Sequence, residues 1–126
     1  MKGRCECGGV AFEMNEIRPD VTVCHCSQCR RFSGHVWAST YVTKENMTFT
    51  SDETLAWYAS SDFARRGFCS RCGSSLFYQL NDETGFGVSA GCIDAPTGMS
   101  TSKHIFVADK GDYYPTPTDA PVLDQH

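Results

Sequence analysis

The sequence predicts a single, mainly β domain with little helix. Its 126 residues, of which 40% are hydrophobic and 21% charged, suit one compact domain. Short runs rich in Val, Thr, Phe, Tyr and Trp recur between clusters of Gly, Ser, Asn and Asp, which is typical of strands joined by turns. No window of a dozen residues keeps apolar side chains at a spacing of 3.6, so long helices are not expected.

The runs are short and closely spaced, which predicts an all-β sandwich or several small packed antiparallel sheets. The expected strands are Val10–Met14, Val21–Cys24, Val36–Val42, Met47–Thr50, Leu55–Ala59, Arg65–Phe68, Ser75–Leu80, Phe86–Ala90 and Ile105–Ala108. Two places favour a short helical turn, one that follows Ser27 and ends near Gly34, the other around Ser61–Ala64.

No linker, repeat or low-complexity segment divides the chain, so we expect one domain over residues 1–126. Its last part, 113–126, contains Pro115, Pro117 and Pro121. Prolines at this spacing do not continue a helix or a central strand. We therefore expect an extended strap or a frayed C-terminal tail.

Composition and charge exclude several functions. The chain carries 11 Lys and Arg against 15 Asp and Glu, a net charge of −4. A nucleic-acid-binding domain normally presents a basic face to the phosphates, so no nucleic acid is an expected partner. No run of about 18 apolar residues is present and the first residues have no apolar core, so we expect no membrane span, no signal peptide and a cytoplasmic location.

The eight cysteines are the strongest signal in the sequence. In a reducing compartment, clustered cysteines bind metal or catalyse more often than they form disulfides. All but one fall into three clusters, which are Cys5-Glu6-Cys7, Cys24-His25-Cys26-Ser27-Gln28-Cys29 and Cys69-Ser70-Arg71-Cys72. Two residues between thiolates suit a tight turn that points both sulfurs at one tetrahedral ion, and one residue between them suits an extended segment.

Pairing the first and third clusters gives a complete four-thiolate site from Cys5, Cys7, Cys69 and Cys72. A closed shell of four thiolates leaves no position for a substrate and indicates a structural zinc ion. Glycine follows both Cys7 and Cys72, where the backbone has to turn tightly beneath the metal.

The middle cluster then keeps three thiolates, Cys24, Cys26 and Cys29. Three protein ligands and one open position are the arrangement of a catalytic zinc ion. Three thiolates make zinc a weak Lewis acid, so binding and exchanging a substrate thiolate is favoured over activating water. By alternation, His25 points away from the ion that Cys24 and Cys26 face.

Two other interpretations of the cysteines stay open. A CxxC pair can be a redox couple, although neither pair here begins a helix in a βαβ setting. The clusters can also form one four-thiolate site and leave inert thiols. Cys92 stands alone and is expected to be a buried, apolar thiol.

Taken with their flanking residues, these clusters resemble the glutathione-dependent formaldehyde-activating enzyme family. The matching runs are Gly3-Arg4-Cys5-Glu6-Cys7-Gly8, the segment from Cys24 to Gly34, the segment from Phe68 to Phe77, and His104–Lys110. The match covers roughly Gly3 to Tyr114, and the tail beyond it fits no pattern of the family.

The resemblance implies an Mss-four-like fold of several coiled β-sheets with two zinc ions per chain. It places them at the same two cysteine groups. The implied activity is of the carbon–sulfur lyase class, joining glutathione to formaldehyde as S-(hydroxymethyl)glutathione. The expected partners are glutathione or another small thiol, and formaldehyde or a related carbonyl. Because the family includes proteins of other roles, a non-catalytic two-zinc β scaffold for a protein partner is the alternative.

Substrate contacts are expected just after the last ligand of the middle cluster. Arg30 and Arg31 can receive the carboxylates of glutathione, although paired arginines are more often a solvated surface. Ser33 and Gly34 are expected at the same edge. His104, before an apolar run, is expected to be a hydrogen-bonded structural residue. The aromatic side chains are expected mainly in the core, and they are Phe12, Phe32, Trp37, Trp57, Phe68, Phe77 and Phe106.

Overall fold

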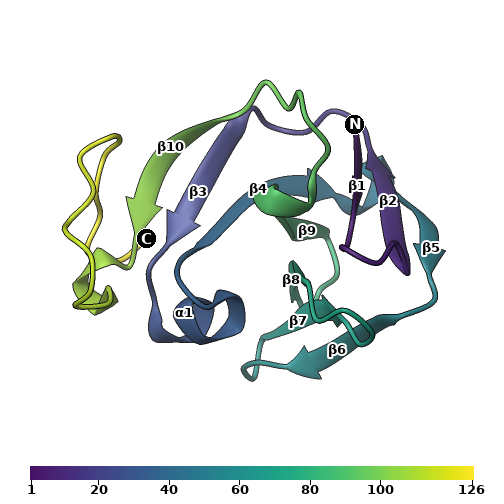
Figure 1. Cartoon of the computed structure of the whole chain (residues 1–126), viewed down its shortest axis with the longest axis horizontal. Helices are drawn as coiled ribbons and strands as arrows, with labels where there is room; N and C mark the ends of the chain where they lie inside the picture. Colours follow the sequence, from purple (N-terminus) through teal and green to yellow (C-terminus); the bar gives the residue numbers. More distant parts are fainter.

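The computed structural model describes residues 1–126 and confirms a mainly β fold, here with two sheets (Figure 1). The small sheet contains β1 (Lys2–Arg4), β2 (Val10–Met14) and β5 (Met47–Asp52), in the order β1–β2–β5. The strands of the large sheet are β3 (Asp20–Cys24), β4 (Trp37–Thr43), β6 (Leu55–Ala59), β7 (Ala64–Cys69), β8 (Ser75–Leu80), β9 (Gly85–Ser89) and β10 (Ser100–Ile105). Their order is β10–β3–β4–β9–β8–β7–β6.

The main hydrophobic core lies between the small sheet and one face of the large sheet. Alternation along β2 turns Val10, Phe12 and Met14 inward, each at most 1% exposed. They belong to the same buried cluster as Phe77 on β8 and Val88 on β9. The rings of Phe12 and Phe77 meet edge to face, with centroids 5.3 Å apart. Burying each such side chain stabilises the fold by about 1.5–3 kcal/mol.

A second, smaller cluster lies apart from this core. It is built on Cys24 at the end of β3, Cys29 and Trp37 at the start of β4. Side chains of Tyr78 and Phe106 pack against it. Along β8, Phe77 faces the main core, so its neighbour Tyr78 points to the opposite face of the large sheet. That face carries the candidate site.

One helix of more than a single turn interrupts the strands. It is α1 (Ser27–Ser33), and it confirms the turn expected after Ser27. The side chain of Cys26 caps its first turn by accepting a hydrogen bond from the Cys29 N–H. Gly34 ends it in the left-handed conformation, with φ of 93°. No helix of the structure has the length and apolarity needed to cross a membrane.

The helical turn expected at Ser61–Ala64 is wrong. These residues form the connection of the β6–β7 hairpin, and Ala64 already belongs to β7. The Ser60 N–H donates to the Ala64 carbonyl at 3.1 Å, which closes the loop. Hairpin pairing between the flanking strands therefore overrides the local preference of this short segment.

The strand expected at Ile105–Ala108 is also wrong in its position. Strand β10 ends at Ile105, and Phe106 takes a left-handed conformation with φ of 54°. Residues Val107–Asp109 then form the 3-10 helix η3. The apolar run was a poor guide because β10 itself, Ser100–Ile105, is mostly polar. It pairs in parallel with β3, which brings the carboxyl ends of both strands to the same edge.

The segment 113–126 runs as an extended strap beside β10 at the edge of the molecule (Figure 1). Its backbone bonds to β10 and to the residues that follow. The Leu123 N–H donates to the His104 carbonyl at 2.9 Å, and the Phe106 N–H donates to the Gln125 carbonyl at 2.9 Å. These contacts place the end of the strap next to the second cluster.

Candidate functional site

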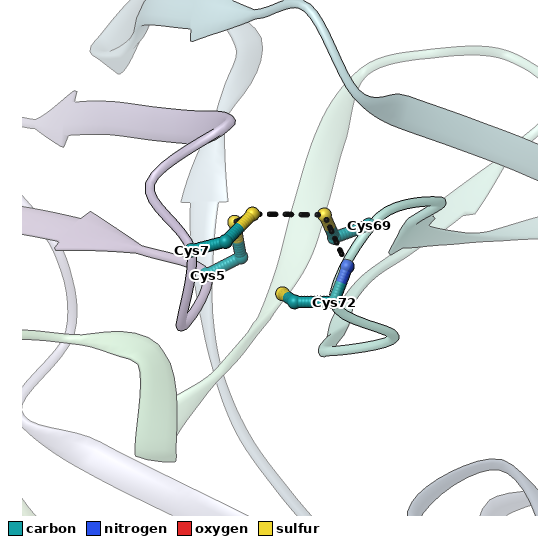
Figure 2. Close-up of side chains that lie close together, drawn as sticks. All are labelled: Cys5, Cys7, Cys69 and Cys72. Carbon is teal, nitrogen blue, oxygen red and sulfur yellow. Dashed lines mark hydrogen bonds between the residues drawn. The ribbon is translucent and has the colours of Figure 1, made fainter.

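The structure brings four cysteines together between the two sheets, and we call them the four-cysteine cluster (Figure 2). Cys5 and Cys7 lie in the turn from β1 to β2, Cys69 ends β7, and Cys72 lies in the turn to β8. Their sulfurs all lie within 4.8 Å of one another. The Sγ atoms of Cys5 and Cys7 are 3.7 Å apart, and those of Cys7 and Cys69 are 3.6 Å apart.

These distances fit a zinc ion. Four sulfurs held at about 2.3 Å from a tetrahedral zinc lie about 3.8 Å from one another. Cys5 and Cys69 are fully buried, and backbone N–H groups point at their sulfurs. The Val10 N–H donates to Cys5 Sγ and the Cys72 N–H to Cys69 Sγ, each at 3.3 Å. Cys7 and Cys72 are exposed, so the cluster suits a metal ion at the edge of the core with all four of its ligand positions taken by protein sulfurs.

The second group contains Cys24, Cys26 and Cys29, which we call the three-cysteine cluster. Cys24 ends β3, Cys26 caps α1, and Cys29 lies in the first turn of α1. Their sulfurs also lie within 4.8 Å of one another. The strand-to-helix junction places all three thiols on one side, as a metal ion requires.

A cavity of about 450 Å³ opens beside the three-cysteine cluster. All three cysteines line it, together with Trp37, Arg66 and other side chains. The four-cysteine cluster lines no cavity as a set. A metal ion at the three-cysteine cluster would therefore be reached by a small molecule, and three thiolates leave a tetrahedral ion one free position.

Arg66 is the one cation in the wall of this cavity, and it is buried, with 3% exposure. Its Nη2 donates to Cys29 Sγ at 3.3 Å, and its Nε donates to the Gln28 side-chain oxygen at 2.7 Å. No carboxylate lies within ion-pair distance. Among the groups that Arg66 contacts, the Cys29 sulfur is therefore the one that can carry a balancing negative charge.

The thiols of the cluster differ in their acidity. The pKa of Cys29 is lowered to about 6 by its hydrogen bond with Cys24 and by the Arg66 guanidinium, although burial opposes the shift. The pKa of Cys24 is raised by the same Cys24–Cys29 hydrogen bond and by burial. Cys29 thus becomes a thiolate, the form that binds metal, more readily than Cys24.

Comparison with known proteins identifies the family. The family model described as glutathione-dependent formaldehyde-activating enzyme matches residues 1–109. The chain belongs to this family. Both cysteine clusters and the wall residues Trp37, Arg66 and Tyr78 fall inside the matched region, whereas the strap falls outside it.

Two further proteins are similar to this chain. A Schizosaccharomyces pombe protein described as an uncharacterized lyase is 25% identical over 118 residues, covering 90% of this chain and 82% of its own. The crystal structure of a Rhodobacter sphaeroides protein superposes with a TM-score of 0.64 at 27% identity. That match covers 75% of this chain and 89% of the Rhodobacter chain.

Beside the three-cysteine cluster of this family member, His25 points away from the sulfurs, as alternation predicted. Its Nδ1 lies 2.8 Å from the Tyr114 hydroxyl and its Nε2 lies 2.9 Å from His104 Nδ1. His104 in turn lies 2.8 Å from an Asp119 carboxylate oxygen. The pKa of His25 is lowered by burial and by the neighbouring His104. Both histidines therefore join the strap to β3 and β10.

The predicted substrate contacts lie outside the cavity wall. The Arg30 Nε donates to the Asp109 carbonyl at 3.2 Å, and Arg31 lines a separate hollow with Phe32 and Tyr58. The Ser33 hydroxyl donates to the Cys29 and Val36 carbonyls. Gly34 is the residue that ends α1. A substrate role for these four residues remains a prediction.

Arg66 is the site residue that sequence reasoning overlooked. The predicted strand Arg65–Phe68 contained the signal, because adjacent side chains on a strand point to opposite faces. With Arg65 and Arg66 in sequence, one arginine has to point inward. Arg65 lies on the face of the sheet that carries the main core, where it bonds to Gln79 and Glu83, and Arg66 lies on the opposite face and contacts the cluster. Which of the two points inward depends on the register with β8.

Proposed function

We propose that this protein is a zinc-dependent enzyme of the carbon–sulfur lyase type that joins a small thiol to a small carbonyl compound. Glutathione and formaldehyde are the proposed pair, with S-(hydroxymethyl)glutathione as the product. The family description names both compounds, and the S. pombe relative is described as a lyase. The observation that carries the proposal is the three-cysteine cluster opening on a cavity of about 450 Å³.

In this proposal Cys24, Cys26 and Cys29 hold the catalytic zinc ion, and the four-cysteine cluster holds a structural one. When bound at the three-cysteine cluster, zinc lowers the pKa of a thiol that reaches its free position and so supplies a thiolate near neutral pH. The substrate sulfur attacks the carbonyl carbon and a C–S bond forms. The carbonyl oxygen accepts the displaced electron pair and then a proton.

Arg66 adjusts the charge of the site. Three thiolates and one Zn²⁺ carry a net charge of about −1 by simple ion counting, and the guanidinium beside Cys29 brings the total to zero. A substrate thiolate then joins a neutral site instead of an anionic one. The N–H···S contact also withdraws charge from Cys29, which makes the metal a better electron acceptor.

Tyr78 is the donor that we assign to the carbonyl oxygen. It lines the cavity, and burial raises the pKa of its hydroxyl, so the hydroxyl keeps its proton at neutral pH. A fixed donor beside the oxygen stabilises the negative charge that forms there. The indole N–H of Trp37, buried without an acceptor in the protein, belongs to the same wall.

Exchange NMR spectroscopy tests the reaction directly. With zinc-loaded protein, the exchange between free and hydroxymethylated glutathione should run faster than the spontaneous rate. Cys26→Ser should lower this acceleration by about 100-fold or more. Losing a residue that only supports a metal ligand costs about 10- to 100-fold, and losing a ligand itself should cost more. Cys92→Ser is the control, because Cys92 belongs to neither cluster and donates only to the Ser75 carbonyl.

Two results would contradict the proposal. If the zinc-loaded protein leaves the exchange at its spontaneous rate, the reaction is wrong, and a two-zinc scaffold that binds a protein partner becomes the better hypothesis. If Cys26→Ser keeps full activity and two zinc ions per chain, the reaction stands but its site is elsewhere.

A further inference from the structure

A second cavity adjoins the one at the three-cysteine cluster. Its volume is about 300 Å³, and the two cavities share Thr22, Ser39 and Tyr78 in their walls. These shared residues show that the two cavities are neighbours, and we call the two together the groove. It starts at the three-cysteine cluster and follows the face of the large sheet that points away from the main core.

The sheet register explains the direction and the depth of the groove. Side chains alternate along β3, so Asp20, Thr22 and Cys24 point to the same face. Four residue steps along the strand lead from Asp20 to Cys24, a distance of about 13 Å. Gly87 lies in register between Tyr41 on β4 and Tyr78 on β8, and its missing side chain keeps the floor of the groove low.

Two opposite charges lie at the far end of the groove. Arg18 and Asp20 both line it, and both are exposed. The Arg18 guanidinium lies over the Tyr41 ring, 5.4 Å from the centroid. Neither side chain forms an ion pair or a hydrogen bond with another protein group. The groove thus offers one unpaired cation and one unpaired anion side by side.

We propose that the groove binds the peptide part of a glutathione-like thiol, with its zwitterionic α-amino-acid end between Arg18 and Asp20. This inference rests on the proposed function, because it places the substrate sulfur at the three-cysteine cluster. The γ-glutamyl carboxylate lies against Arg18 and the ammonium group against Asp20. These contacts select a γ-glutamyl peptide thiol over a simple alkyl thiol.

The dimensions agree with such a ligand. In glutathione seven bonds join the cysteine sulfur to the α-carbon of the γ-glutamyl residue, a reach of about 9 Å when they are extended. The long side chain of Arg18 and the carboxylate of Asp20 reach inward across the remaining few ångströms of the roughly 13 Å between Asp20 and Cys24. The combined hollow falls in the size range of ordinary small-molecule sites, about 300–1,000 Å³. Arg30 and Arg31 do not line it and cannot supply these contacts from their present positions.

The test measures glutathione affinity in Arg18→Gln and Asp20→Asn variants of the zinc-loaded protein by calorimetry. Lys2→Gln and Glu13→Gln are the matched controls, because they remove the same charges from an exposed ion pair on the small sheet. Two glutathione analogues are measured in the same way. The first lacks the α-carboxylate of the γ-glutamyl residue, and the second lacks its α-amino group.

We expect Arg18→Gln to raise the Kd of glutathione by about tenfold, the loss of one charge-assisted contact. The same variant should leave the Kd of the analogue without the carboxylate unchanged. Asp20→Asn should raise the Kd of glutathione to a similar degree and leave the Kd of the analogue without the amino group unchanged. The control variants should bind all three ligands like the unmodified protein.

Different results would contradict the groove proposal and the proposed reaction. If exchange between free and hydroxymethylated glutathione is accelerated but Arg18→Gln and Asp20→Asn bind glutathione normally, the groove proposal is wrong and the reaction stands. If the variants weaken glutathione binding as expected but no acceleration is measured, the groove proposal stands and the reaction is wrong. If glutathione does not bind the zinc-loaded protein at all, both are overturned.

Discussion

Arg66 shows how one side chain connects the fold to the chemistry of the site. It is 3% exposed and has no carboxylate partner, yet its guanidinium touches Cys29 Sγ and lies over the rings of Phe32 and Tyr78. A buried cation without an anion costs several kcal/mol, so the arginine and the thiolates depend on each other.

Replacing Arg66 should therefore weaken metal binding at the three-cysteine cluster. We expect Arg66→Gln to lower zinc affinity there by about 10- to 100-fold, the usual cost of losing a residue that supports a metal ligand. Arg66→Lys should restore part of the loss because it keeps the charge. Competition with a chromophoric chelator measures the affinity, and the sulfur-to-metal absorption of the cobalt form reports on the ligands.

Arg65→Gln is the control for this experiment. Arg65 is the neighbouring residue on β7, but its side chain lies on the opposite face of the sheet from the cluster and bonds to Gln79 and Glu83. Its loss should leave zinc affinity unchanged. Equal affinities for the Arg65 and Arg66 variants would show that Arg66 does not support the metal.

At the scale of elements, β1 was the strand that the sequence did not predict. It has three residues, too few to show an alternating pattern. Its pairing with β2 depends on Gly3, since a Cβ there would lie 2.5 Å from the Phe12 ring and 2.7 Å from the Cys92 carbonyl oxygen. Tertiary contact, which a local pattern does not contain, decides this element.

Gly3→Ala should therefore destabilise the protein by about 1–3 kcal/mol, the cost of overpacking a well-filled core. Gly91→Ala is the matched control, because a Cβ at Gly91 meets nothing within 4 Å. Thermal unfolding of the zinc-loaded variants measures the difference. Equal transition temperatures for the two variants would mean that β1 can move away from Phe12 at no cost.

The strap is the second element that depends on tertiary contacts. The sequence left open whether 113–126 is extended or frayed, since the prolines are compatible with both. The structure docks it through His104, which bonds to Asp119 on one side and His25 on the other. The expectation that His104 is a hydrogen-bonded structural residue is confirmed, but its partners lie 79 and 15 residues away in sequence.

Asp119→Asn should loosen the strap. The hydrogen bond from His104 lowers the pKa of Asp119, so its contribution is complete above the ordinary pKa of aspartate, about 4, and is lost as the pH falls through the lowered value. At neutral pH the variant should show faster amide exchange at Leu123 and Phe106 than the Asp112→Asn control. Unchanged protection in Asp119→Asn would show that backbone pairing alone holds the strap.

At the scale of the whole molecule, the four-cysteine cluster joins the two sheets. The turn after β1 belongs to the small sheet and the turn after β7 to the large sheet, and Figure 2 shows their sulfurs facing one another. The sequence predicted this grouping from cysteine spacing, and the structure brings the same four residues together. The cysteine spacing did not show that the four residues come from two different sheets, because no single motif determines how two sheets pack.

Chelation should remove two zinc ions in two steps. The three-cysteine cluster opens on a cavity, so its ion should leave first and with little change in β-sheet circular dichroism. Removing the ion of the four-cysteine cluster should unfold the protein, since such sites contribute about 10–16 kcal/mol of binding free energy. Simultaneous loss of both ions with the fold would contradict a separate, accessible site.

The parallel pairing of β3 with β10 also sets an order of events during synthesis. The four-cysteine cluster is complete once Cys72 has been made, whereas β10 begins at Ser100 and the strap follows it. All four cysteines of the sheet-joining cluster are therefore made before the residues that form the edge of the cavity. Closing the long loop between β3 and β10 costs more chain entropy than closing a local hairpin, so we expect this contact to form late. In our proposal, a nascent chain thus has every ligand of its structural ion before it has the chamber in which a thiol meets the second ion.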